Sequence, residues 1–149
     1  MSAGQLKIHH LGIAVADMDA ALAVYQNGLG FVLDSEMFDD PIQRVQVCFL
    51  KTKCNDGFLI ELVKPLGATS PVNGYLSKGI GAYHICYEVD EIDKTLAELR
   101  SQKCLPLGAP VPAVAFGGRR IAWCVTPTKH LIELVETQMP ATGRDANCG

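Results

Sequence analysis

Short apolar runs rich in β-branched residues alternate with polar segments along the chain, which predicts a series of strands. Two of these runs, 8–15 and 83–89, are each followed by a segment with helical periodicity. In the first of these segments, the apolar positions at i, i+3, i+4 and i+7 are Met18, Ala21, Leu22 and Tyr25. Asp17 is the expected N-cap of this helix, and Asp90 is that of the second.

Three strands are predicted after each helix, so the order β-α-β-β-β occurs twice. The strands of the first half cover 31–38, 45–51 and 58–64. Those of the second half cover 105–114, 120–125 and 131–135.

The two halves also repeat each other in sequence. His10 begins the hexapeptide His-Leu-Gly-Ile-Ala-Val, and His84 begins His-Ile-Cys-Tyr-Glu-Val, 74 residues later. The pentapeptide Leu-Ile-Glu-Leu-Val occurs unchanged at 59–63 and 131–135. Two related modules are therefore expected at about 6–65 and 80–137, with a linker helix at about 70–79 and a polar tail at 138–149.

The composition is that of a globular chain. Hydrophobic residues make up 48% of the 149 residues and charged residues 19%, which argues against disorder. A net charge of −3 argues against nucleic acid as a partner, because phosphate binding needs a basic surface. Neither a membrane-spanning apolar run nor a signal-peptide layout is found, so we expect a cytoplasmic protein. The six cysteines lack a C-x-x-C pair and are expected to be reduced.

One histidine and one glutamate stand at equivalent positions in each module: His10 with Glu61, and His84 with Glu133. Each would be unremarkable alone, since a strand glutamate usually faces solvent. Their recurrence at the same places in both modules favours a shared site. If the modules pack about a pseudo-twofold axis, two imidazoles and two carboxylates converge. That donor set suits one divalent ion of Co, Zn, Ni, Mn or Fe.

Three residues near His10 in the sequence enter the same argument. His9 competes as a ligand, but strand alternation places it on the opposite face. The repeat equates His10 with His84, so His10 is preferred. Alternation places Gly12 and Ala14 on the face of His10, where small residues would leave room for a ligand or allow close backbone packing.

These motifs resemble the vicinal oxygen chelate (glyoxalase/bleomycin resistance/dioxygenase) superfamily over about residues 6–137. The resemblance implies an α+β fold in which two tandem βαβββ modules form a curved mixed sheet around a metal site. It also implies that the metal ligands are His10, Glu61, His84 and Glu133. Within the superfamily, the chain is most similar to methylmalonyl-CoA epimerases. The segments that carry this closer similarity are Lys64–Gly67, Ser70–Leu76 and Gly117–Ile121.

The resemblance implies a divalent-metal-dependent epimerase that abstracts a proton next to a carbonyl, with Glu133 as a catalytic group. The expected partners are a small-molecule substrate, such as an acyl-CoA, and a second copy of the chain in a homodimer. Gln43 is a candidate polar contact to the substrate. Arg119 and Arg120 are candidates for a substrate carboxylate or phosphate, although alternation allows at most one of them to face the site.

One segment departs from the epimerase pattern. Similar epimerases carry an acidic residue in a Pro-Glu-Gln/His-Gly-Val stretch before the third strand, where this chain has Pro-Ile-Gln-Arg-Val at 41–45. Ile42 cannot transfer a proton. Either Asp39 or Asp40 substitutes, or a metal-bound glutamate detaches to act, or the substrate differs.

Two alternative functions remain open at this point. A glyoxalase I-like lactoylglutathione lyase can use the same ligand set, although such enzymes commonly carry an arginine where Ala14 stands here. A non-catalytic member of the superfamily would bind a small molecule without turning it over. The intact ligand set argues against this second alternative, and the missing acid argues mildly for it.

Overall fold

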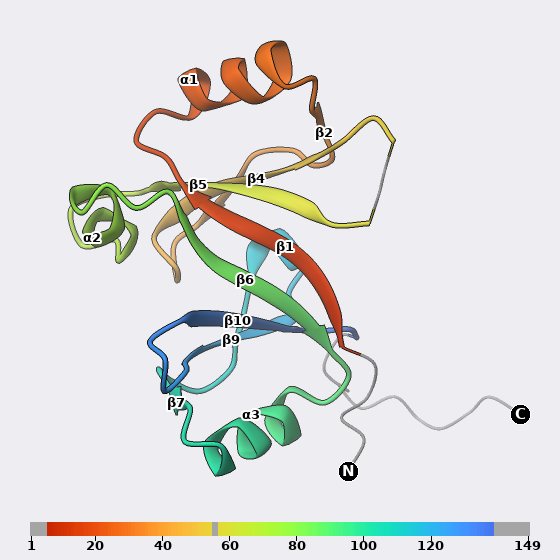
Figure 1. Cartoon of the computed structure of the whole chain (residues 1–149), viewed down its shortest axis with the longest axis vertical. Coiled ribbons are helices and arrows are strands. Elements are labelled where there is room, and N and C mark those ends of the chain that lie inside the picture. The colour runs from red at the N-terminus through yellow and green to blue at the C-terminus, as the bar shows by residue number, and fades with distance from the viewer. Residues whose placement is uncertain (1–5, 55–56, 139–149) are drawn as a thin grey trace, which may run out of the picture.

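The computed structural model describes residues 6–54 and 57–138, and its strands form one curled, ten-stranded mixed sheet (Figure 1). The strands are β1 Lys7–Ala14, β2 Val32–Leu33, β3 Phe38–Asp40, β4 Val45–Lys51, β5 Leu59–Pro65, β6 Ala82–Val89, β7 Leu105–Pro106, β8 Val111–Pro112, β9 Arg120–Val125 and β10 Leu131–Glu136. The helices are α1 Met18–Ala23, α2 Val72–Ser77 and α3 Ile92–Ser101. A π-helical turn, Val24–Gly28, continues α1, and a 3₁₀ turn, Val114–Phe116, precedes β9.

The strand order is symmetric about the central pair β1–β6. It runs β2-β4-β5-β1-β6-β10-β9-β7, with β3 paired to β4 and β8 paired to β9. β1 is parallel to β5, β6 is parallel to β10, and the central pair is antiparallel. The predicted α+β class and the curved mixed sheet are confirmed. The predicted tail lies outside the described residues except for Gln138.

Helices α1 and α3 cover the outer face of the sheet at its two ends, whereas α2 packs against the valines of the inner face (Figure 1). Met18 of α1 packs with Leu62 of β5, and Leu96 of α3 packs with Leu134 of β10. The inner face holds two apolar clusters, one around Phe116 and one around the valines of β4 and β5. Within the described residues, no helix is long and apolar enough to cross a membrane. The five cysteines in that part of the chain are free.

Of the two predicted helix N-caps, one is confirmed and one is wrong. Asp17 caps α1 by accepting the N–H of Ala20 at 3.0 Å, as expected. Asp90 does not cap α3, because its carboxylate accepts the Thr137 hydroxyl and Glu91 takes the N-cap position.

The predicted strand 31–38 is interrupted rather than continuous. It consists of β2 and β3, because the Ser35 hydroxyl, not a backbone carbonyl, accepts the N–H of Phe49. The predicted strand 105–114 is likewise split into the two short strands β7 and β8, with Gly108 and Pro110 between them.

Candidate metal centre

Side chains alternate between the two faces along β5 and β10, and this alternation directs one glutamate of each strand to the inner face of the curled sheet. Leu62 and Leu134 point outward beneath their helices, so the preceding Glu61 and Glu133 point inward. The same inner face receives His10 from β1 and its counterpart from β6. The four equivalent positions therefore lie on four adjacent strands in the middle of the sheet.

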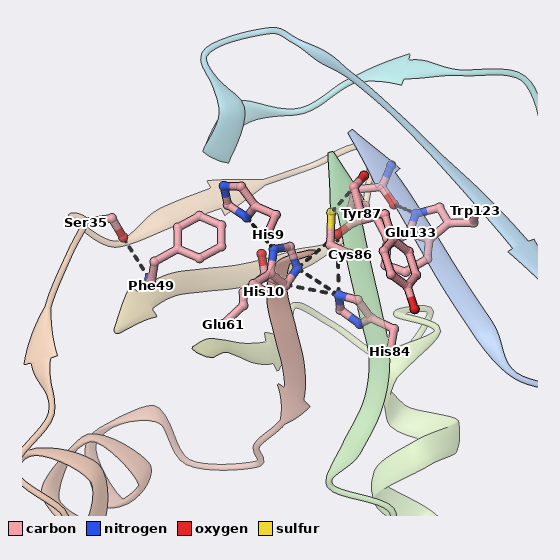
Figure 2. Close-up of polar contacts among 11 residues, drawn as sticks. His9, His10, Ser35, Phe49, Glu61, His84, Cys86, Tyr87, Trp123 and Glu133 are labelled. Atoms are coloured by element: carbon pink, nitrogen blue, oxygen red, sulfur yellow. Dashed lines mark hydrogen bonds and ion pairs between the residues drawn. The ribbon is translucent and has the colours of Figure 1, made fainter. Parts of the chain in front are cut away.

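The four side chains converge (Figure 2), and one potential ligand atom from each lies within 4.8 Å of all the others. His10 Nε2 is 3.0 Å from Glu133 Oε1, 3.4 Å from Glu61 Oε1 and 3.0 Å from His84 Nε2. His84 Nε2 lies 3.6 Å from Glu61 Oε1 and 3.4 Å from Glu133 Oε1. All four residues are buried, His10 completely.

This geometry fits a divalent cation. Nitrogen and oxygen ligands about 2.1 Å from a tetrahedral ion lie about 3.4 Å from one another, and the observed separations bracket that value. Glu133 Oε1 is buried, and the two imidazole nitrogens beside it form no hydrogen bond with it, a costly arrangement that a bound cation would relieve. Two imidazoles and two carboxylates provide two negative charges, so the donor set could hold one such ion.

The charges within the cluster shift the pKa values of its members. Burial alone would lower the pKa of His10, but the charge of Glu61 and the close approach of Glu133 raise it to about 10. Burial alone would raise the pKa of Glu133, but the close contacts and charges of His10 and His84 hold it below its usual value. The acidic groups thus favour a cation at their centre, whether a proton or a metal ion.

Gly12 makes room for His84. It pairs with Glu61 on β5 and with His84 on β6, so it lies between two of the four side chains. A Cβ atom at this position would lie 1.9 Å from Cε1 of the His84 ring. The space expected beside His10 is therefore occupied by the imidazole of its repeat partner.

The prediction that His9 faces away from His10 is wrong. Between Ile8 and His10 the register of β1 against β6 shifts, and the extra residue breaks the alternation. The two imidazoles meet at 2.9 Å between their Nδ1 atoms (Figure 2). Burial, with help from His10, lowers the pKa of His9 to about 4.

A cavity of about 310 Å³ opens beside the cluster. Glu61 and Glu133 contribute to its wall, and so does the predicted substrate contact Gln43. Most of its surface is apolar, formed by the valines of β4 and β5 together with Phe116, Trp123 and other residues. The arrangement of an apolar cavity with a few convergent polar groups is typical of a small-molecule site.

The loop 41–44 is fixed to the opposite half of the sheet. Asp40 accepts the backbone N–H groups of Ile42 and Gln43, and its second oxygen accepts that of Val114 at 3.3 Å. Gln43 Oε1 accepts the indole N–H of Trp123 at 3.1 Å. This loop therefore has a fixed position beside the cavity.

Arg120 does not join these residues. Its guanidinium pairs with Glu136 at 3.0 Å and with Asp93 at 3.1 Å, on the side of the sheet that α3 covers. Arg119 pairs with Glu88 at 3.2 Å. Neither arginine lines the cavity, because their ion pairs hold them elsewhere. The sequence contains those partners but does not indicate the pairing.

Comparison with known families agrees with the geometry. The family described as the Glyoxalase/Bleomycin resistance protein/Dioxygenase superfamily matches residues 9–123. The chain belongs to this superfamily. Among curated relatives, it is 35% identical over 117 residues to the ethylmalonyl-CoA/methylmalonyl-CoA epimerase of Cereibacter sphaeroides. That match covers 77% of this chain and 84% of the relative.

Solved structures include both named and unnamed proteins of this shape. A hypothetical protein from Bacillus halodurans C-125 matches with a TM-score of 0.79 and 29% identity, covering 94% of this chain and all of that one. Methylmalonyl-CoA epimerase from Mycobacterium tuberculosis matches with a TM-score of 0.77 and 30% identity over 91% and 89% of the two chains. A methylmalonyl-CoA epimerase in complex with methylmalonyl-CoA and NH₄⁺ matches with a TM-score of 0.75 and 26% identity. The match covers 92% of this chain and all of that one.

Proposed function

We propose that this chain is a divalent-metal-dependent epimerase that moves a proton on the carbon next to an acyl thioester carbonyl. The observation that carries the proposal is the buried set of two histidines and two glutamates that opens onto an apolar cavity. The curated relative that acts on ethylmalonyl-CoA and methylmalonyl-CoA supports the same chemistry.

His10, Glu61, His84 and Glu133 would hold the metal. When bound, a divalent ion supplies Lewis-acid stabilisation of charge on a carbonyl oxygen, which is worth several kcal/mol. The carboxylates add proton transfer. Glu133 lines the cavity, so its oxygen has access to a substrate proton there. We assign it as the first proton-transfer group.

The second proton-transfer group replaces the acid that is missing at Ile42. Asp40 is a poor candidate, because its oxygens already accept three backbone N–H groups. Asp39 is exposed, accepts the Gln46 amide and does not line the cavity. Glu61 lines the cavity from the strand equivalent to that of Glu133, so we assign it as the second group.

The cavity also supports an acyl substrate. Its apolar wall suits the alkyl part of the acyl group, and Gln43 offers a polar contact. Since Gln43 Oε1 already accepts the Trp123 N–H, the amide nitrogen remains to donate to a substrate oxygen. Substrate recognition therefore depends on this loop and not on Arg120.

The test is exchange of the α-proton of methylmalonyl-CoA in D₂O, followed by proton NMR with metal-reconstituted protein. We expect loss of the α-proton signal with the wild type and a decrease of at least about 100-fold in rate with Glu133→Gln. Glu91→Gln removes an exposed carboxylate at the start of α3 and serves as the matched control, with an unchanged rate. Bound metal is measured in every sample.

Other outcomes identify the alternatives. Full metal occupancy without exchange, accompanied by tight binding of the acyl-CoA, would indicate a non-catalytic binding protein. Turnover of a glutathione hemithioacetal instead would indicate the glyoxalase I-like lyase. Against that lyase, the position of its usual arginine is Ala14, which is buried among apolar side chains including Val63 and Val72.

A further inference from the structure

The bulge in β1 brings a third histidine, His9, to the candidate metal centre. Ile8 pairs with Tyr87 and His10 pairs with Cys86, so His9 is an extra residue opposite two consecutive residues of β6. Such a bulge redirects a side chain relative to a regular strand. Figure 2 shows the result, with the His9 ring lying against that of His10.

Aromatic packing fixes the orientation of His9. Its ring meets Phe49 edge to face at 5.6 Å between centroids and Phe116 at 5.1 Å. It meets the His10 ring at 5.1 Å with an angle of 85° between the planes. In this orientation the two Nδ1 atoms are 2.9 Å apart, which is hydrogen-bond distance.

The direction of this hydrogen bond follows from the other nitrogen of His10. His10 Nε2 faces Glu61, Glu133 and the second histidine of the cluster. A neutral imidazole that gives its Nε2 lone pair to a metal carries its hydrogen on Nδ1. His10 Nδ1–H must then donate, and His9 Nδ1 must accept.

The arrangement is particular to one half of the molecule. Tyr83 stands before His84 where His9 stands before His10, and a tyrosine ring offers no nitrogen acceptor. Among the described residues, Nδ1 of His84 is buried without a hydrogen-bond partner. The repeat therefore provides its own comparison between a supported ligand and an unsupported one.

We propose that His9 is a positioning residue for the metal centre: its Nδ1 lone pair holds His10 in the Nδ1–H tautomer, with Nε2 directed at the ion. Partners of this kind hold a ligand imidazole in place, and their loss typically lowers metal affinity 10- to 100-fold. The inference rests on the metal site of the proposed function, but it does not depend on the substrate.

The first test compares zinc affinities by chelator competition. His9→Phe keeps an aromatic ring against Phe49 and Phe116 but removes the acceptor, so we expect affinity to fall about 10- to 100-fold. His9→Asn places an amide oxygen near the position of Nδ1 and should restore affinity to within a few-fold of the wild type. His130→Asn is the matched control, because His130 is exposed, and it should have no effect.

The second test reads the tautomers directly. Two-dimensional ¹H–¹⁵N spectra of zinc-loaded wild-type protein labelled at histidine nitrogens should show His10 protonated at Nδ1 and His9 at Nε2. This measurement decides the matter even if His9→Phe fails to fold. A proton on Nδ1 of His9 would overturn the proposal.

The remaining outcomes separate this inference from the proposed function. If the wild type binds zinc and folded His9→Phe binds it equally well, His9 has no positioning role and the metal site stands. If His9→Asn binds as weakly as His9→Phe, the acceptor is not what matters, and the proposal fails. If the wild type binds no zinc, the metal site itself is wrong, and both conclusions fail.

Discussion

Position 12 must be glycine because the His84 imidazole occupies the space of a side chain there, and not because of the backbone conformation. A methyl group at this position would overlap the His84 ring, which cannot retreat without leaving the cluster. We predict that Gly12→Ala lowers the free energy of unfolding by about 1–3 kcal/mol through overpacking. It should also lower zinc affinity more than 10-fold. Chemical denaturation and chelator competition measure the two effects.

Gly74 provides the matched control for that change. It lies in α2, and a Cβ atom there would have no heavy atom within 4 Å. Gly74→Ala should raise the free energy of unfolding by roughly 0.5–1 kcal/mol, as alanine does in a helix. Zinc affinity should not change. Equal effects of the two substitutions on metal binding would contradict the steric role of Gly12.

Strand β9 carries a structural ion pair at its first residue. The buried carboxylate of Glu136 accepts from the backbone and the guanidinium of Arg120. We predict that Arg120→Ala lowers the free energy of unfolding by about 1–3 kcal/mol, because it leaves that carboxylate underpaired. The α-proton exchange rate should be unchanged, because Arg120 does not line the cavity.

The exposed pair Lys94–Glu91 is the reference for this prediction. Lys94→Ala removes an i,i+3 pair from the surface of α3 and should change stability by less than about 1 kcal/mol. If folded Arg120→Ala instead lost most of its exchange activity, Arg120 would have to contact the substrate, and this prediction would be wrong.

The turn before β4 places a non-glycine residue in the left-handed region. Arg44 has φ 57°, a conformation that costs an L-residue roughly 1–2 kcal/mol. Glycine relieves this strain but loses roughly 0.5–1 kcal/mol in unfolded-state entropy. We therefore predict that Arg44→Gly raises the free energy of unfolding in urea by up to about 1 kcal/mol.

Lys129 has φ 67° in another turn and tests the backbone origin of that effect. Lys129→Gly should give a similar gain. If Arg44→Gly is destabilising while Lys129→Gly is stabilising, the Arg44 side chain contributes contacts that outweigh its strain.

The candidate metal centre joins both halves of the molecule. Its four side chains come from β5, β1, β6 and β10, so an ion bound there would link the central strands of the whole sheet. Zinc at 100 times its dissociation constant should raise the free energy of unfolding by about 2.7 kcal/mol. Chelation should reverse the gain, and His84→Ala should abolish it, as followed by thermal unfolding with and without zinc.

The outer face of the sheet carries exposed apolar side chains that a second copy of the chain could cover. Helices α1 and α3 cover the two ends of this face (Figure 1). On the central strands between them, Ile8 is 53% exposed and Ile85 is 38% exposed. We predict a homodimer that buries this face, with twice the 16.1 kDa mass by light scattering. Ile85→Glu should give a monomer, whereas Leu105→Glu on β7 should not. A monomeric wild type would contradict the prediction.

The sequence by itself determined the order of the long strands and the helices, and the four residues of the candidate metal centre. Strand alternation and helical periodicity depend on neighbours a few residues apart, so they can be read along the chain. The repeat then related His10 to His84 and Glu61 to Glu133 without any structure. Their convergence follows from the symmetric order of the sheet.

Only the tertiary structure decided the environment of those four residues. The register shift at His9 depends on the pairing of β1 with β6, and the ion pairs of Arg120 depend on α3 and β10. The contacts of Asp40 likewise reach Val114, which is 74 residues away. Such contacts join segments that are distant in sequence, so no local pattern contains them. Packing between distant segments therefore brought His9 to the centre and kept Arg120 away from the cavity.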